Sequence, residues 1–227
     1  DLERNRVLPE GAAGLEVLGL EAAGNRLALL LADEGRLAVL AYDSSDGTLL
    51  GELVLEDMIV STDPSVELPG EVHSGSYQAY ADHDTGVLNL LLYRTPEGPE
   101  LVSVTMLSFD LADGVRRVAA VKESYERERA ERDSHGVTKL SYRDGKLIVL
   151  KTLQETKEES GILYEALQPR HLMIFVYEDG KPVYQGELVT DANDDLHRIV
   201  NADNRGFGYD VWDYRHFYNM TITGSGG

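Results

Sequence analysis

The chain has 227 residues, of which 42% are apolar and 27% charged, as is typical of a globular protein with a sizeable core. Its 40 acidic residues outnumber the 21 basic ones and give a net charge of −19, so we expect no nucleic-acid partner. The absence of cysteine excludes disulfides, thiolate metal sites and cysteine nucleophiles. No apolar run reaches the length of about 18 residues that a membrane span needs.

The first part of the chain predicts four short strands. They are residues 15–20, 27–32, 37–42 and 48–55. The turn Asp33-Glu34-Gly35 and the turn at residues 43–47 contain the glycines that hairpin turns require. The strands are almost continuously apolar, which predicts burial on both faces, as in sheets stacked face to face. Residues 56–76 contain Pro64, Pro69 and two glycines and are expected to be a polar connector.

Two further groups of four strands follow. We expect them at residues 77–81, 87–93, 101–109 and 115–121, and at residues 137–142, 146–153, 171–177 and 182–189. Between these groups, residues 122–133 favour helix, because they are good helix formers with charges of mixed sign, but they have no apolar face. A solvated excursion is the preferred interpretation, and a docking peptide is the alternative. Residues 196–202, 207–214 and 216–223 predict three more strands and no fourth.

The turns recur with a period of about 60 residues. The first turn of each group contains Gly24, Gly86, Gly145 or Gly206, and the second turn contains Gly47, Gly114 or Gly180. An aromatic residue and an acid precede the second turn each time, as Tyr42-Asp43, Phe109-Asp110 and Tyr177-Glu178. Two markers with the same period predict a repeat of four antiparallel strands.

A repeat of this kind resembles the β-propeller superfamily in architecture. The resemblance implies one all-β domain over residues 1–223, with blades at residues 15–55, 77–121, 137–189 and 196–223, and a flexible tail at 224–227. The apolar residues at 6–8 would supply the missing last strand and close a four-bladed ring. The alternatives are that the chain is part of a larger propeller, or that it forms a pair of β-sandwiches. No WD40 or kelch signature recurs, since Trp212-Asp213 occurs once.

The sequence contains no nucleophile motif, phosphate loop, dinucleotide fingerprint or zinc-protease motif. None of the histidines lies at metal-ligand spacing from another. They are His73, His83, His135, His171, His197 and His216. We therefore predict no cofactor. If a metal is bound, Ca²⁺ fits best, with oxygens from residues 82–84, 191–195 or 203–204. Turn formation is the preferred interpretation of these Asp and Asn residues.

The last group of strands differs from the others in composition and holds the candidate ligand-binding residues. Aromatic rings beside charged groups suit a carbohydrate- or peptide-binding surface, whereas packing between strands is the competing interpretation. The candidates are Asp210, Trp212, Asp213, Tyr214, Arg215 and His216. No residue is assigned a catalytic role.

Three functions fit these observations. The preferred one is a non-catalytic domain that binds a protein or cell-envelope ligand through its loop face. The alternatives are a carbohydrate-active hydrolase or lyase with an acidic and aromatic central pocket, and a structural part of a larger propeller. We expect a bacterial, extracytoplasmic protein, which predicts a signal peptide or membrane anchor upstream of Asp1. The partner is expected to be a protein or a glycan, and the sequence leaves the oligomeric state open.

Overall fold

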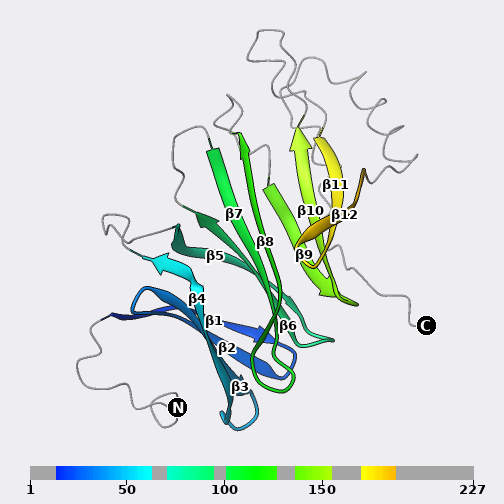
Figure 1. Ribbon diagram of the computed structural model, residues 1–227. Coiled ribbons are helices and arrows are strands. Elements are labelled where there is room, and N and C mark those ends of the chain that lie inside the picture. Colours follow the sequence, from blue (N-terminus) through cyan, green and yellow to red (C-terminus); the bar gives the residue numbers. More distant parts are fainter. Residues whose placement is uncertain (1–13, 63–70, 95–100, 127–135, 155–169, 188–227) are drawn as a thin grey trace, which may run out of the picture.

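The computed structural model describes residues 14–62, 71–94, 101–126, 136–154 and 170–187, and in these ranges the chain is all-β (Figure 1). The strands form two sheets. Their bounds are β1 (Leu15–Ala23), β2 (Arg26–Asp33), β3 (Arg36–Asp43), β4 (Leu49–Ser61), β5 (Val72–Asp82), β6 (Val87–Arg94), β7 (Leu101–Asp110), β8 (Arg116–Glu126), β9 (Gly136–Arg143), β10 (Lys146–Gln154), β11 (Arg170–Glu178) and β12 (Lys181–Glu187). No helix suited to crossing a membrane occurs in these ranges.

The larger sheet contains eight strands in the order β1 to β8, and the smaller one has the order β12-β11-β10-β9. Each strand pairs antiparallel with the next in sequence, except that β4 and β5 are parallel. We call β1–β4 the first meander, β5–β8 the second meander, and the three parallel pairs between β4 and β5 the seam. The seam joins Ile59 to Val72, Val60 to His73 and Ser61 to Ser74.

The prediction of a β-propeller is wrong for the described chain. A propeller consists of separate four-stranded blades in a closed ring, whereas here the first two meanders are one open mixed sheet. The physical reason lies in the predicted connector at 56–76. Met58 and Val60 are buried, so β4 continues to Ser61, and β5 begins at Val72 and pairs with it. The proposed closing strand at 6–8 and the group at 196–223 lie outside the described residues.

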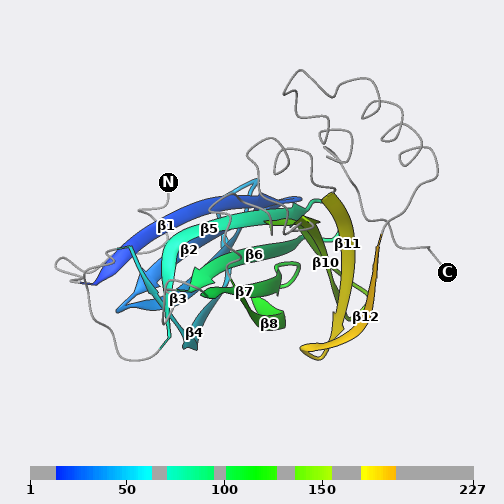
Figure 2. The same ribbon diagram turned by 90° about the horizontal axis from the view of Figure 1, so that it is seen from above.

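The eight-stranded sheet bends so that its two meanders face each other, and β1 runs alongside β5 (Figure 2). The core between them contains Leu30, Leu37 and Val39 from the first meander and Leu90 and Phe109 from the second. Full burial of aliphatic and aromatic side chains is the main source of stability here, at about 1.5–3 kcal/mol for each large one.

A second core joins the second meander to the four-stranded sheet. It contains Leu91 and Met106 on one side, and Leu140, Leu147 and Val149 on the other. The second meander is therefore the middle of three layers. In the first meander, residues 37–42 of β3 are all buried, with alternate side chains in cores on opposite faces. For β3 this confirms the predicted burial on both faces, whereas β1 and β4 have exposed positions such as Val17 and Leu49.

The helix expected at residues 122–133 is not found where the chain is described, because residues up to Glu126 continue β8. The exposure of their side chains alternates along the chain, as it does in a strand with one covered face. Val121 enters the second core, while Lys122 and Glu123 form ion pairs with Glu71 and Lys151. Residues 127–133 lie outside the described residues.

Candidate functional site

Most residues that the sequence singled out for ligand binding lie outside the described chain. These are Asp210, Trp212, Asp213, Tyr214, Arg215 and His216, the metal candidates at 191–195 and 203–204, and His135 and His197. The turn at residues 82–84 is described. Among the described residues, no group of three histidines and carboxylates is arranged to hold a metal ion.

The Asp82 carboxylate serves the turn that it begins. Its Oδ1 accepts hydrogen bonds from the backbone N–H groups of Asp84 at 3.1 Å and Thr85 at 3.3 Å. Its Oδ2 accepts one from Arg143 of β9 at 2.7 Å, which ties the turn to the four-stranded sheet. Partial burial works against ionisation, but these donors outweigh it and lower the pKa of Asp82. The geometry agrees with the turn interpretation.

Six hairpin turns of the described chain lie at one end of the sheets, which we call the turn end, whereas the turn at residues 34–35 lies at the other end. The strand register shows which turns are neighbours. Val87 of β6 pairs with both Asp82 and Asp110, which begin the turns at residues 83–86 and 111–115. Lys146 of β10 pairs with both Arg143 and Glu178, which precede the turns at residues 144–145 and 179–180. The turn end comprises the turns at residues 24–25, 44–48, 83–86, 111–115, 144–145 and 179–180.

Turns of different meanders are also bonded to one another at this end. The N–H of Gly24 donates to Nδ1 of His83 at 3.1 Å, which places the first turn of one meander against the first turn of the next. The Arg26 guanidinium donates to Asp43 at 2.8 Å and to the carbonyl of Ala112 at 3.0 Å. Backbone and side-chain bonds therefore hold the turns in fixed positions, which favours a rigid surface.

A cavity of about 160 Å³ lies at the turn end between β8 and the four-stranded sheet. One wall is the stretch from Val118 to Val121, whose two alanines leave space. The other wall carries the rings of Tyr142 and Tyr177. Asp179 and the turn glycines Gly145 and Gly180 complete the lining, so the cavity borders the turns of the four-stranded sheet.

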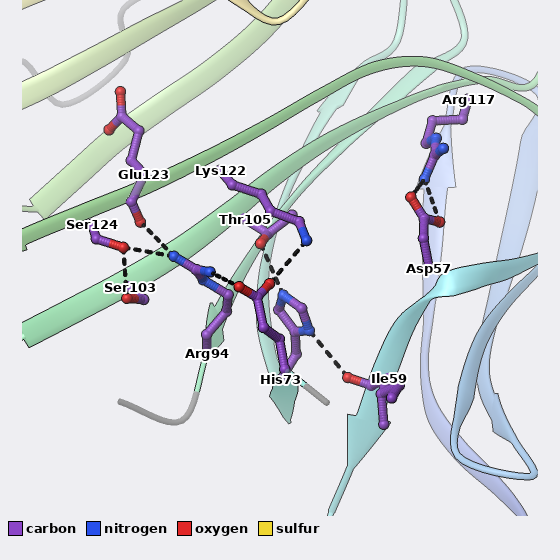
Figure 3. Close-up of polar contacts among 11 residues, drawn as sticks. Asp57, Ile59, His73, Arg94, Ser103, Thr105, Arg117, Lys122, Glu123 and Ser124 are labelled. Carbon is purple, nitrogen blue, oxygen red and sulfur yellow. Dashed lines mark hydrogen bonds and ion pairs between the residues drawn. The ribbon is translucent and has the colours of Figure 1, made fainter. Parts of the chain in front are cut away.

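A polar cluster surrounds the seam (Figure 3). At its centre is His73, which is 1% exposed. Its Nδ1–H donates to the carbonyl of Ile59 at 3.1 Å, and its Nε2 lies 2.8 Å from the hydroxyl of Thr105. Because a carbonyl oxygen only accepts, neutral His73 carries its proton on Nδ1, and Nε2 accepts from Thr105.

Charged groups lie around this histidine. Arg94, with a side chain 12% exposed, donates to Glu71 at 2.8 Å and to the hydroxyl of Ser124 at 2.7 Å. Lys122 reaches the second oxygen of Glu71 at 2.9 Å. The hydrogen bond from Lys122, together with Arg94, lowers the pKa of Glu71 against the opposing effect of burial. These contacts connect β5, β6 and β8.

Two more ion pairs brace the same region. Asp57 of β4 accepts two hydrogen bonds from Arg117 of β8, both 2.8 Å long, and the hydrogen bond from Arg117 lowers the pKa of Asp57. Glu123 accepts from Lys151 and from the hydroxyl of Tyr177, which links β8 to the four-stranded sheet. The cluster thus holds the three layers together.

His73 and Thr105 have the spacing of a base and a nucleophile, but the pair is closed to substrates. Thr105 is 0% exposed, and both ring nitrogens of His73 are engaged in hydrogen bonds. A catalytic hydroxyl must meet its substrate, so this pair holds strands together instead. His73 escaped prediction because it lies in the expected connector at residues 56–76. The apolar Met58 and Val60 on alternate positions indicate that the strand continues, but they do not indicate its partner strand.

No protein-family model matches the sequence, and a search of curated proteins found no match.

Proposed function

We propose that the chain is a non-catalytic domain that binds a protein partner through its turn end, and that the partner inserts a basic side chain between β8 and the four-stranded sheet. The cavity carries this proposal. Its volume of about 160 Å³ is below the range of about 300–1,000 Å³ for drug-sized ligands. A single side chain of a protein suits that space better than a whole small molecule.

The lining favours a cation over an apolar or acidic group. Tyr142 and Tyr177 place aromatic residues in the lining, and an aromatic ring attracts a guanidinium or ammonium group by about 0.5–1 kcal/mol at exposed sites. Asp179 supplies a carboxylate at the same place. The exposed acids of the neighbouring turns, Glu178 and Asp144 among them, and the net charge of −19 favour the approach of a basic partner.

The test uses a synthetic peptide of alternating arginine and glycine, followed by NMR chemical shifts of the backbone amides. We expect saturable shifts at residues 118–121 and 177–180, weakening as salt is added. Asp179→Asn should reduce the affinity about two- to fivefold, because one partly exposed ion pair is lost. Asparagine tolerates the positive φ of 49° at this position, so the turn is preserved.

Asp144→Asn is the matched control, because Asp144 has the same place in the other Asp-Gly turn, a φ of 51°, and no part in the cavity lining. It should change the affinity less than Asp179→Asn does. Equal effects of the two variants, or equal binding of a glutamate–glycine peptide, would show that the cavity does not select a basic side chain.

The carbohydrate-active alternative depends on the residues at 210–216, which lie outside the described chain, and it stays a prediction. The extracytoplasmic location is likewise a prediction, tested by the sequence upstream of Asp1.

A further inference from the structure

The seam is the shortest strand pairing in the eight-stranded sheet. Three residue pairs join β4 to β5, and His73 is the middle one of the three β5 residues in these pairs. The His73 side chain adds two contacts of its own, one to the Ile59 carbonyl of β4 and one to Thr105 of β7. A single imidazole therefore connects both meanders at the place where the backbone pairing is sparse.

The contact to the Ile59 carbonyl is kept in either protonation state, whereas the hydrogen bond that Thr105 donates to Nε2 requires the neutral imidazole. A proton on Nε2 turns that atom from an acceptor into a donor, so Thr105 must accept where it had donated. The hydroxyl hydrogen of Thr105 then needs another acceptor in a site that is 0% exposed. A buried polar group left without a partner costs about 1–3 kcal/mol.

The charges around His73 also favour the neutral form. Arg94 of β6 and Lys122 of β8 are cations, and Glu71, which precedes β5, is shared between them and half exposed. On β4 and β8, Asp57 and Arg117 neutralise each other, and the Glu123 carboxylate is taken by Lys151 and Tyr177. Burial lowers the pKa of His73, and Lys122 and Arg94 lower it further, against the Ile59 hydrogen bond and Glu71.

We propose that the seam is a pH-sensitive joint, in which protonation of His73 loosens β4 from β5 and lets the two meanders separate locally. His73 binds its second proton less readily in the folded sheet than in the unfolded chain, so the free energy of unfolding rises with pH. The stabilisation is complete above the ordinary histidine pKa of 6.5 and declines as the pH falls below that value. This joint is independent of the partner-binding function proposed above.

Hydrogen exchange of single amides tests the joint. After correction for intrinsic exchange rates, the protection of the seam amides at residues 72–74 should fall severalfold between about pH 7.5 and about pH 5. Amides of β2 and β3, such as Leu40, should keep their protection. Equal loss of protection in β2 and β3 would overturn the proposal, because the whole fold would then be opening.

His73→Asn removes the titration and retains an N–H donor near the position of Nδ1, so its seam protection should be the same at both pH values. His83→Asn is the matched control. His83 is exposed and bonded to the Gly24 amide, so this variant should keep the pH dependence of the wild type.

Two further measurements keep the proposal testable if His73→Asn does not fold. NMR titration of the wild type should place the pKa of His73 below 6.5, and a value at or above 6.5 would refute the joint. Lys122→Gln removes a neighbouring cation and should shrink the loss of protection at low pH. An unchanged loss in Lys122→Gln counts against the proposal.

Discussion

Replacing Gly51 of β4 with alanine tests how closely the first meander packs on the second. A Cβ atom at Gly51 would lie 3.0 Å from Cα of Gly114 and 3.1 Å from the backbone nitrogen of Val115, in the turn between β7 and β8. Ordinary contacts of such an atom are 3.4–4 Å. Both opposing atoms belong to the backbone and cannot rotate away, so the turn must move by a few tenths of an ångström.

Overpacking of this kind typically costs about 1–3 kcal/mol. Removing a glycine also restricts the unfolded chain, which stabilises the protein by about 0.4–1 kcal/mol. We therefore expect Gly51→Ala to lower the free energy of unfolding by about 0.5–2.5 kcal/mol. Urea unfolding followed by circular dichroism should show a lower midpoint with an unchanged slope.

Gly86→Asn is the control for adding a side chain to a glycine. A Cβ at Gly86 meets nothing within 4 Å, so this variant feels only the strain of a side chain at a φ of 70°, which asparagine adopts more readily than most residues. It should lose less stability than Gly51→Ala does. If Gly51→Ala is as stable as Gly86→Asn, the two meanders do not pack as closely at Gly51 as described.

Two further predictions concern buried and partly buried polar groups. Ser108 donates to Asn89 at 2.7 Å in a fully buried pair, so Ser108→Ala should cost about 1–3 kcal/mol in urea unfolding, because the Oδ1 of Asn89 loses its donor. Asp82→Asn should cost about 1.5–3 kcal/mol at neutral pH, because the ion pair with Arg143 is lost. The lowered pKa of Asp82 means that its contribution is fully present above the ordinary pKa of 3.8 and is lost as the pH falls through the lower folded-state value, so the difference between the two proteins should shrink as the pH falls below about 4. A difference that stays constant as the pH falls further would contradict the assignment.

The turns were the most predictable part of the fold, for a local physical reason. Glycines at 24, 35, 47, 86, 114, 145 and 180 all have positive φ, which other residues adopt only at a cost. Acidic residues beside them, such as Asp144 and Asp179, share that conformation. Local chemistry therefore placed the hairpins and, with them, most strands.

The seam was not predictable in the same way, because nothing local specifies it. Residues 56–61 are mixed in character, and only tertiary contacts decide that Met58 and Val60 are buried beside Leu55. The pairing of β4 with β5 therefore replaced the expected break between two blades. A period of about 60 residues is compatible with separate sheets and with joined ones.

In the candidate site, too, the locally determined features were predictable and the tertiary contacts were not. The sequence identified the acids at the turns but not the partners of their carboxylates. Asp82 and Asp110 each accept a hydrogen bond from a backbone N–H of their own turn. Each also binds an arginine, which is Arg143 of β9 for Asp82 and the nearby Arg116 for Asp110. The cavity beside Tyr142 and Tyr177 arises where two sheets meet. The spacing of residues within a single strand therefore cannot predict this cavity.

The connectivity of the eight-stranded sheet also orders its assembly. Each meander pairs strands that are neighbours in sequence, so its contacts close short loops and form early. The seam pairs join residues 13 apart in sequence, whereas the hydrogen bond between His73 and Thr105 spans 32 residues and needs β7 in place. Interactions made after the rate-limiting step retard unfolding and leave the folding rate almost unchanged. We expect this hydrogen bond to be one of them, so that it affects the lifetime of the folded sheet more than the speed at which it is reached.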